Sequence, residues 1–158
     1  MSVQDSAGTK NVARAFIAAW NACDLAVVGE LLADDFVWHV AVAGEAEIAL
    51  RPFQSKALQG QRLPIPGLRT GKQDTLRFFA NLLDDRADER HRLRLREVSM
   101  LAEGDRVAVE AEGEMINPAN GRSYRNIYCL LLTIRDGQIT VYKEYQDTLH
   151  IYDVVMAD

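Results

Sequence analysis

The sequence predicts one α+β domain over residues 1–158, with N-terminal helices packed on a curved mixed or antiparallel sheet. Three observations lead to this fold class. Apolar residues recur at helical spacing in the first part of the chain, and apolar and polar residues alternate after Arg90. No repeat or interdomain linker divides the sequence. Its 48% hydrophobic and 26% charged residues are typical of a soluble globular protein.

The N-terminal part predicts two helices and a strand. Residues 7–20 place apolar side chains on one face of a helix. Asp24 is the predicted N-cap of a second helix over residues 25–32. Residues 36–42 are rich in β-branched and aromatic side chains, which indicates a strand.

The middle of the chain predicts a long loop and a third helix. Residues 45–69 have no clean period and contain several prolines and glycines. Loops of this length in compact domains are often lids or binding loops. Thr70 and Gln73 form a capping-box pattern, which predicts a helix that continues to about Leu83.

The C-terminal half predicts an antiparallel meander of four strands joined by short turns. The strands are residues 91–101, 106–116, 123–135 and 138–148. A three-residue turn between the first two strands would place Arg96 beside Glu110 and Arg94 beside Glu112. These charges would face outward, so we do not expect the glutamates of the second strand to form a catalytic pair.

Composition excludes several classes of function. A net charge of −5 argues against nucleic acid as the main partner, because phosphate binding needs clustered Lys and Arg. No apolar run approaches the roughly 18 residues of a membrane-spanning helix, and the polar start of the chain predicts no secretion signal. Cys23 and Cys129 are expected to be reduced core thiols, and the three histidines are scattered. We therefore expect a cytoplasmic protein without a metal or an organic cofactor.

Three short motifs, together with the order of elements, carry a family resemblance. The motifs are Tyr124-x-Asn126-x-Tyr128, Asp136-Gly137-x-Ile139 and Glu144-Tyr145-x-Asp147-Thr148-x-His150. They resemble the SnoaL-like branch of the nuclear transport factor 2-like superfamily, which is related to polyketide cyclases, ketosteroid isomerases and limonene epoxide hydrolases. The resemblance covers essentially the whole chain. It implies a cone-shaped α+β barrel with a small apolar organic ligand in its mouth, and a homodimer formed through the outer sheet surface.

The resemblance to limonene epoxide hydrolase also implies site residues. Glu144 falls where that enzyme has the carboxylate that activates water, Tyr142 where it has a pocket tryptophan, and Trp38 where it has a pocket tyrosine. The inward-facing wall implied in this way consists of Trp38, Val40, Val109, Ala111, Met115, Asn126, Tyr128, Leu130, Tyr142, Glu144 and Gln146.

The sequence departs from the hydrolase at three of its functional positions. Ala111 and Gly113 stand where that enzyme has an Arg and a second Asp, and Val40 replaces its water-orienting Asn. The chemistry of the hydrolase is therefore not expected to be copied in full.

The candidate catalytic residues each admit two interpretations. Glu144 on an apolar wall would have a raised pKa suited to a general base, or it is a buried structural acid. Asn126 orients Glu144 or polarises a substrate carbonyl, or it satisfies buried backbone. Tyr128 and Tyr142 donate hydrogen bonds to a developing oxyanion, or they are walls. Asp147 and His150 are expected to anchor the C-terminal segment.

Two classes of function remain open on the sequence alone. The first is a cofactor-independent enzyme, an isomerase, cyclase, hydrolase or dehydratase acting on a small, largely apolar carbonyl, epoxide or polyketide-like compound. The second is a non-catalytic ligand-binding or dimeric association module of the same fold. The fold by itself does not choose between them, because it hosts enzymes and binding modules alike.

Overall fold

The computed structural model describes residues 6–40, 69–83, 87–151 and 153–154. In chain order the elements are α1 (Ser6–Asn21), α2 (Leu25–Leu31), β1 (Leu32–Val40), β2 (Arg69–Gly71), α3 (Lys72–Leu82), the 3-10 helix η2 (Glu89–His91), β3 (Arg94–Glu103), β4 (Arg106–Ile116), β5 (Ser123–Arg135), β6 (Gln138–Gln146) and α4 (Thr148–Ile151). The predicted α+β class is confirmed. No helix in this part of the chain has the length and apolar character to span a membrane.

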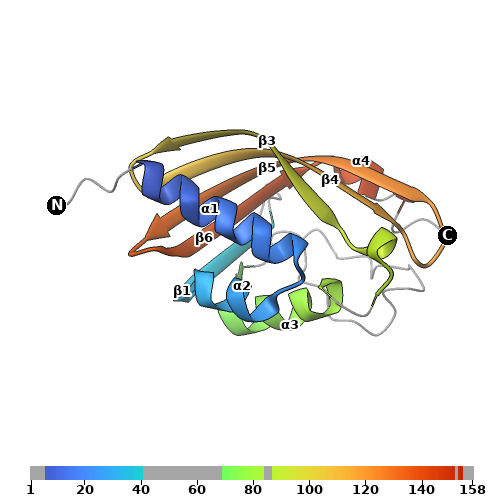
Figure 1. The fold of residues 1–158 in the computed structure, drawn as a ribbon, viewed down its shortest axis with the longest axis horizontal. Helices are drawn as coiled ribbons and strands as arrows, with labels where there is room; N and C mark the ends of the chain where they lie inside the picture. The colour runs from blue at the N-terminus through green and yellow to red at the C-terminus, as the bar shows by residue number, and fades with distance from the viewer. Residues whose placement is uncertain (1–5, 41–68, 84–86, 152, 155–158) are drawn as a thin grey trace.

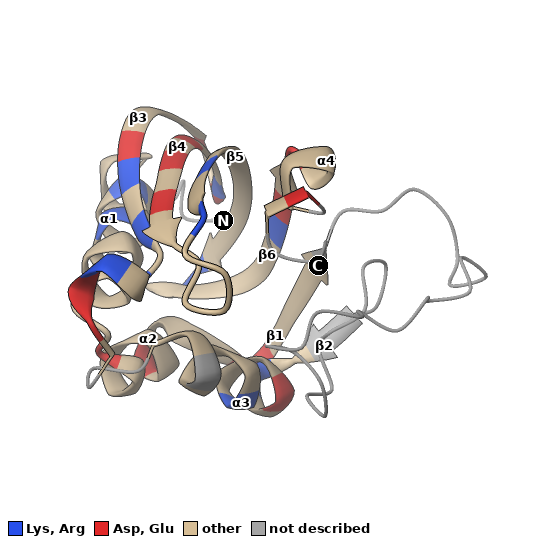
Figure 2. Ribbon diagram, turned by 90° about the vertical axis from the view of Figure 1, so that its right-hand side faces the viewer, with Lys and Arg blue, Asp and Glu red and all other residues tan. Residues whose placement is uncertain are grey.

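One six-stranded sheet, in the order β2-β1-β6-β5-β4-β3, organises the domain. Strands β3 to β6 form the predicted antiparallel meander, and β1 pairs with β6 in parallel, so the sheet is mixed. Figure 1 shows α1 lying along one face of the curved sheet. Helices α2 and α3 lie next to each other near β1, as a second view also shows (Figure 2).

The N-terminal elements agree with the sequence except at their ends. The Asp24 side chain accepts a hydrogen bond from the backbone N–H of Val27 (3.0 Å), which confirms the predicted N-cap of α2. Strand β1 begins at Leu32, four positions before the predicted start, and the predicted loop lies almost entirely outside the described residues. The predicted capping box is wrong, because Thr70 belongs to β2 and Gly71 is the N-cap residue of α3.

The β3–β4 hairpin is shifted by two residues from the predicted pairing. Arg96 lies beside Glu112 rather than Glu110. Arg94 lies beside Glu114 rather than Glu112. The strands turn over two residues only, and a bulge interrupts β3 midway. Because side chains alternate with a period of two, this shift leaves Arg94 and Arg96 on their predicted outer face. Beyond the bulge the alternation changes phase, so that Met100 is buried and Leu101 is exposed.

Two side chains at the end of α1 fix this helix to β3. The indole Nε1–H of Trp20 donates to the carbonyl of Leu93 at 2.9 Å. Asn21 exchanges two hydrogen bonds with the backbone of Leu95, donating through Nδ2 at 2.7 Å and accepting through Oδ1 at 2.8 Å. The amide of Asn21 thus replaces a neighbouring strand at this sheet edge. The helix is held over the buried face of the meander.

Gly113 on β4 makes room for an aromatic ring of the neighbouring strand. A Cβ atom added at Gly113 would lie 2.5 Å from Cε2 of Tyr128 and 3.1 Å from Cδ1 of Leu93. Real contacts of this kind are never so short. The absence of a side chain at Gly113 therefore determines where the Tyr128 ring lies.

Replacement of Gly113 by alanine is expected to destabilise the domain by about 1–3 kcal/mol, because the Tyr128 ring must move. Urea denaturation would measure this change. Gly8→Ala in α1 is the matched control, since a Cβ at Gly8 meets nothing within 4 Å and alanine favours a helix. An equal stability for both variants would contradict the packing described for Gly113.

Candidate functional site

Strand register brings the predicted wall residues onto one face of the sheet. Residues paired across neighbouring strands point to the same side. The successive rows are Trp38–Tyr142–Leu132, Val40–Glu144–Leu130–Val109, Gln146–Tyr128–Ala111, Asn126–Gly113 and Tyr124–Met115. The structure thus brings all eleven predicted residues together on three strands of the meander and on β1.

Most of these residues are buried. Fully buried are Trp38, Val109, Ala111, Asn126, Tyr128, Leu130 and Tyr142, whereas Met115, Glu144 and Gln146 are partly buried. The position of Val40 is given by its pairing with Glu144, and its side chain lies outside the description. The face is therefore apolar and aromatic, with one carboxyl group in it.

Glu144 has a tyrosine as its hydrogen-bond partner. The hydroxyl of Tyr142 donates to Oε2 of Glu144 at 2.8 Å. Among the described lysines and arginines, none forms an ion pair with Glu144. Burial raises the pKa of Glu144, and the hydrogen bond from Tyr142 lowers it by a smaller amount. The resulting pKa is about 7, compared with the usual 4.5. Near neutral pH the carboxyl group can therefore either accept or donate a proton.

Tyr142 remains a hydrogen-bond donor throughout the pH range of Glu144 titration. Burial, and then the negative charge of Glu144, raise the pKa of Tyr142 well above its usual value. Its ring lies between Phe16 of α1 (5.7 Å between ring centroids) and Trp38 of β1 (6.1 Å). Contacts with two aromatic rings thus help to fix the position of the Tyr142 side chain, whose hydroxyl binds Glu144.

Asn126 uses its whole side-chain amide for structural hydrogen bonds. Its Nδ2 donates to the hydroxyl of Tyr124 and to the carbonyl of Asp147, each at 3.0 Å. Its Oδ1 accepts from the backbone N–H groups of Ile127 (2.8 Å) and Asp147 (3.0 Å). Asn126 therefore joins β5 to the residue that follows β6 and positions Tyr124.

A pair of tyrosine hydroxyls lies beside this amide. The hydroxyls of Tyr124 and Tyr128 are 2.7 Å apart, and both rings are buried. The two hydroxyl groups form one hydrogen bond with each other, and this bond uses only one of their two protons. The other proton has no acceptor within the described residues. Either hydroxyl can be the donor, so one proton of the pair stays available for another acceptor. Burial raises the pKa of both tyrosines, which keeps both hydroxyls protonated near neutral pH.

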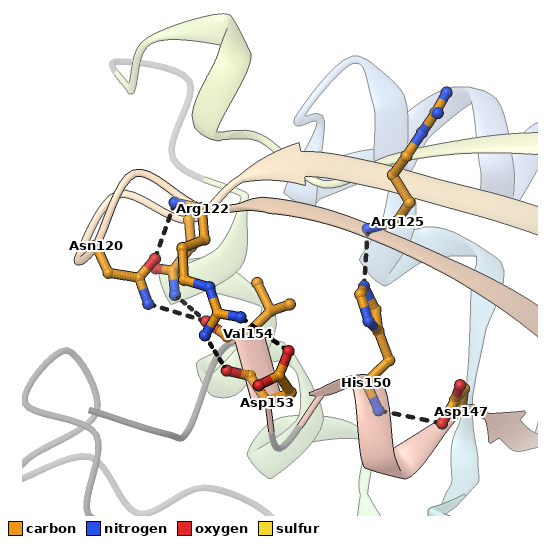
Figure 3. A network of polar contacts seen from close by, with 8 residues as sticks. Asn120, Arg122, Arg125, Asp147, His150, Asp153 and Val154 are labelled. Carbon is orange, nitrogen blue, oxygen red and sulfur yellow. Dashed lines mark hydrogen bonds and ion pairs between the residues drawn. The ribbon is translucent and has the colours of Figure 1, made fainter.

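The C-terminal segment is anchored close to these tyrosines, and sequence reasoning found only part of the anchor. Oδ1 of Asp147 accepts from the backbone N–H groups of Leu149 (3.0 Å) and His150 (3.1 Å), which starts α4. The ring of His150 stacks on Tyr124 at 5.6 Å, and its Nε2 accepts from the Arg125 N–H (Figure 3). The expected anchoring role of Asp147 and His150 agrees with these contacts.

The loop between β4 and β5 holds the chain beyond α4. Asn117 and Asn120 both donate to the carbonyl of Val154, at 2.9 and 3.0 Å. Arg122 forms an ion pair of 2.8 Å with Asp153 (Figure 3). In the sequence these three residues belong to a predicted turn between two strands. Turn residues give no sign of a contact with a distant segment of the chain. They were therefore missed as anchoring residues.

The opposite face of the sheet is charged at one end and apolar in the middle. Arg96 pairs with Glu112, and Glu114 lies 3.6 Å from Arg125. The blue and red bands of β3 and β4 in Figure 2 mark this part of the face. Cys129 is exposed there, so its expected place in the core is wrong, because the alternation of β5 turns it outward. The large apolar side chains exposed along β3, β5, β6 and α4 are Val98, Leu101, Ile127, Tyr145 and Leu149.

The burial of Glu144 makes a prediction for stability. The folded state keeps a proton on Glu144 up to about pH 7, whereas the unfolded chain loses it near pH 4.5, so stability falls as the pH rises between these values. The loss reaches about 3 kcal/mol above pH 7. Glu144→Gln is neutral at every pH and is expected to avoid this loss.

Urea denaturation at about pH 5 and about pH 8 would test this prediction. The stability gained by Glu144→Gln over wild type should be larger at the higher pH. Glu112→Gln on the outer face is the control and should show no such dependence. A pH-independent difference between wild type and Glu144→Gln would mean that Glu144 titrates normally.

Comparison with known proteins agrees with this geometry. Residues 13–142 match the SnoaL-like domain family. No curated protein matches the sequence. An LEH-like epoxide hydrolase from M. tuberculosis is 16% identical, with a TM-score of 0.63 over 95% of this chain and 90% of that chain. No group of three or more His, Cys, Asp or Glu side chains among the described residues could hold a metal ion.

Two further solved structures share the fold at low identity. A candidate SnoaL-like polyketide cyclase from Jannaschia sp. CCS1 is 17% identical, with a TM-score of 0.68 over 100% of this chain and 96% of that chain. A candidate ketosteroid isomerase from Kribbella flavida DSM 17836 is 18% identical, with a TM-score of 0.61 over 92% and 82%. The family match covers most of the sequence, and the chain belongs to the SnoaL-like domain family.

Proposed function

We propose that this protein is a cofactor-independent acid–base enzyme acting on a small, largely apolar carbonyl, epoxide or polyketide-like compound. The observation that carries the proposal is the Glu144 carboxyl group. It is partly buried in an aromatic wall, a tyrosine hydroxyl binds it, none of the described lysines and arginines forms an ion pair with it, and its pKa is raised to about 7. A structural acid at such a position would ordinarily be paired with a cation. A general base works best at this pKa.

In the proposed reaction Glu144 removes a proton from a carbon next to a carbonyl group or from water. When a carbon gives up its proton, the carbonyl oxygen becomes negatively charged as an enolate. One hydroxyl of the Tyr124–Tyr128 pair has a proton to donate to that oxygen, and a donor of this kind stabilises the enolate. Glu144 then returns the proton to the same or another carbon. No redox partner is needed, since no electrons leave the substrate.

The remaining candidate residues take supporting roles in this proposal. Asn126 is a positioning residue, because its amide orients Tyr124, and Tyr124 in turn orients Tyr128. Tyr142 tunes the carboxyl group by its hydrogen bond. The walls around the substrate are assigned to Trp38, Val40, Val109, Ala111, Met115, Leu130 and Gln146.

The packing at Gly113 favours carbonyl chemistry over a copy of epoxide hydrolysis. The sequence resembles limonene epoxide hydrolase, in which the positions of Ala111 and Gly113 carry charged side chains. Here the ring of Tyr128 occupies the space beside Gly113, so a charged side chain at this position would collide with it. In this proposal the wall offers a tyrosine hydroxyl where the hydrolase has charged side chains. A hydroxyl can donate a hydrogen bond to an enolate oxygen.

The activity test uses 1-tetralone, a flat and enolisable ketone, and measures exchange of its α-protons in D2O by NMR. Wild type should accelerate the exchange, and Glu144→Gln should lower the rate by about 10²–10⁴-fold, because the base is lost. Glu112→Gln is the control, because it makes the same carboxyl-to-amide change on the outer face, and it should retain the wild-type rate. Hydrolysis of styrene oxide, run in parallel, distinguishes attack by water. Equal rates for wild type and Glu144→Gln in both assays would overturn the base assignment.

Tyr142→Phe is expected to shift the pH–rate profile. The Tyr142 hydroxyl bonds to the charged form of Glu144 and lowers its pKa. Without this bond the pKa of Glu144 rises above about 7, so the rate should reach its plateau at a higher pH than in wild type. A profile that stays in place or moves to lower pH would contradict the role given to Tyr142.

We also propose a homodimer formed through the outer face of the sheet, on the strength of its exposed apolar side chains. Leu101 and Ile127 are 74% and 65% exposed. The same exposed apolar side chains favour the second candidate function, an association module, whether or not the domain is also catalytic.

Ile127→Lys should weaken the dimer without unfolding the domain, since the lysine would lie beside Glu112. Analytical ultracentrifugation at micromolar concentration would show a dimer for wild type and a larger monomer fraction for the variant. A wild-type monomer would refute the dimer and remove the argument for an association module.

A further inference from the structure

Trp38 holds a buried hydrogen-bond donor that has no acceptor. Its side chain is 5% exposed, and its indole Nε1–H finds no partner within the part of the chain that the structure describes. The other tryptophan of the sequence, Trp20, satisfies the same group with the Leu93 carbonyl at 2.9 Å. Buried polar groups are nearly always hydrogen-bonded, so an exception indicates a missing partner.

The unsatisfied donor lies in the same wall as Glu144. Trp38 pairs directly with Tyr142, whose hydroxyl binds Glu144 at 2.8 Å. Its ring also packs against Phe78 and Phe79 of α3, with centroids 5.5 and 5.4 Å away. A buried water needs two to four polar partners to be stable. The rings of Phe78 and Phe79 offer no such partner.

We infer that the indole N–H of Trp38 is a recognition group for an acceptor oxygen of the ligand. The preferred ligand class is a flat, largely apolar molecule that carries a carbonyl oxygen. Its body packs against the aromatic wall, and its oxygen accepts the indole N–H. A hydrocarbon of the same shape would leave this donor unsatisfied and bind more weakly. The inference rests on the proposed function in one respect, because it places the ligand at the wall that contains Glu144.

The direct test is an indole NMR experiment with two matched probes. 1-Tetralone has a carbonyl oxygen, and tetralin has nearly the same shape without one. The sequence contains two tryptophans, so a 15N-labelled sample gives two indole signals, and the Trp38→Phe and Trp20→Phe variants assign them. The Trp38 indole proton should move downfield with 1-tetralone and should show no such downfield shift with tetralin, while the Trp20 signal stays in place.

Affinity gives a second readout. Trp38→Phe keeps an aromatic ring and removes the donor, and should weaken 1-tetralone binding by about tenfold with tetralin binding unchanged. Trp20→Phe should lower stability without changing the ratio of the two affinities. An indole shift or an affinity loss of the same size for both probes, or no Trp38 shift with 1-tetralone at millimolar concentration, would overturn the inference.

The Glu144→Gln variant separates this inference from the proposed function. If the variant still binds 1-tetralone and the Trp38 signal still moves, recognition stands whatever the catalytic result. If wild type binds 1-tetralone through Trp38 and catalyses no exchange or hydrolysis, the enzyme proposal fails and the recognition site remains. If wild type catalyses exchange and the Trp38 signal does not move, the inference fails alone.

Discussion

Parallel pairing of β1 with β6 is the contact on which the arrangement of the wall depends. It joins the N-terminal half of the chain to the meander, and it aligns Trp38 with Tyr142 and Val40 with Glu144. Without it, the Glu144 end of this face would lack Trp38 and β1, and α1, which is bonded at the start of β3, would remain as a cover. With it, the indole of Trp38 and the aromatic rings of α1 and α3 enclose that face. The strand pairing thereby creates the apolar surroundings in which one carboxyl group has unusual properties.

Glu144 shows how two opposing effects set a titration range. Burial disfavours the carboxylate, and the Tyr142 hydroxyl favours it. A full ion pair would have stabilised the charged form and kept the carboxyl group ionised at all physiological pH values. With a hydroxyl partner, the pKa of Glu144 stays near 7, so the group can exchange protons with a substrate at neutral pH. Keeping the ionised carboxylate away from water costs free energy, and the packing of the surrounding core offsets this cost.

Alternation in the sequence predicted the faces of the meander because side chains in a strand repeat every two residues. The pairing error at Arg96 therefore left the arginines on the correct face, whereas the bulge in β3 reversed the faces of the residues after it. Contacts between distant elements could not be predicted in this way. The parallel β1–β6 pairing, the bond between Tyr142 and Glu144 and the unsatisfied indole of Trp38 depend on which neighbours meet in space. Asn126 illustrates the limit, since its place on the wall follows from the pattern and its four hydrogen bonds do not.

The most direct test of the account is the pKa of Glu144, measured by 13C NMR of side-chain carboxyl groups in protein labelled at glutamate. The account predicts one carboxyl signal with its midpoint at about pH 7, and this signal should be absent from Glu144→Gln. If every glutamate carboxyl, including that of Glu144, has its midpoint near pH 4.5, the carboxyl group is solvated or paired with a cation, and the proposed acid–base role is wrong.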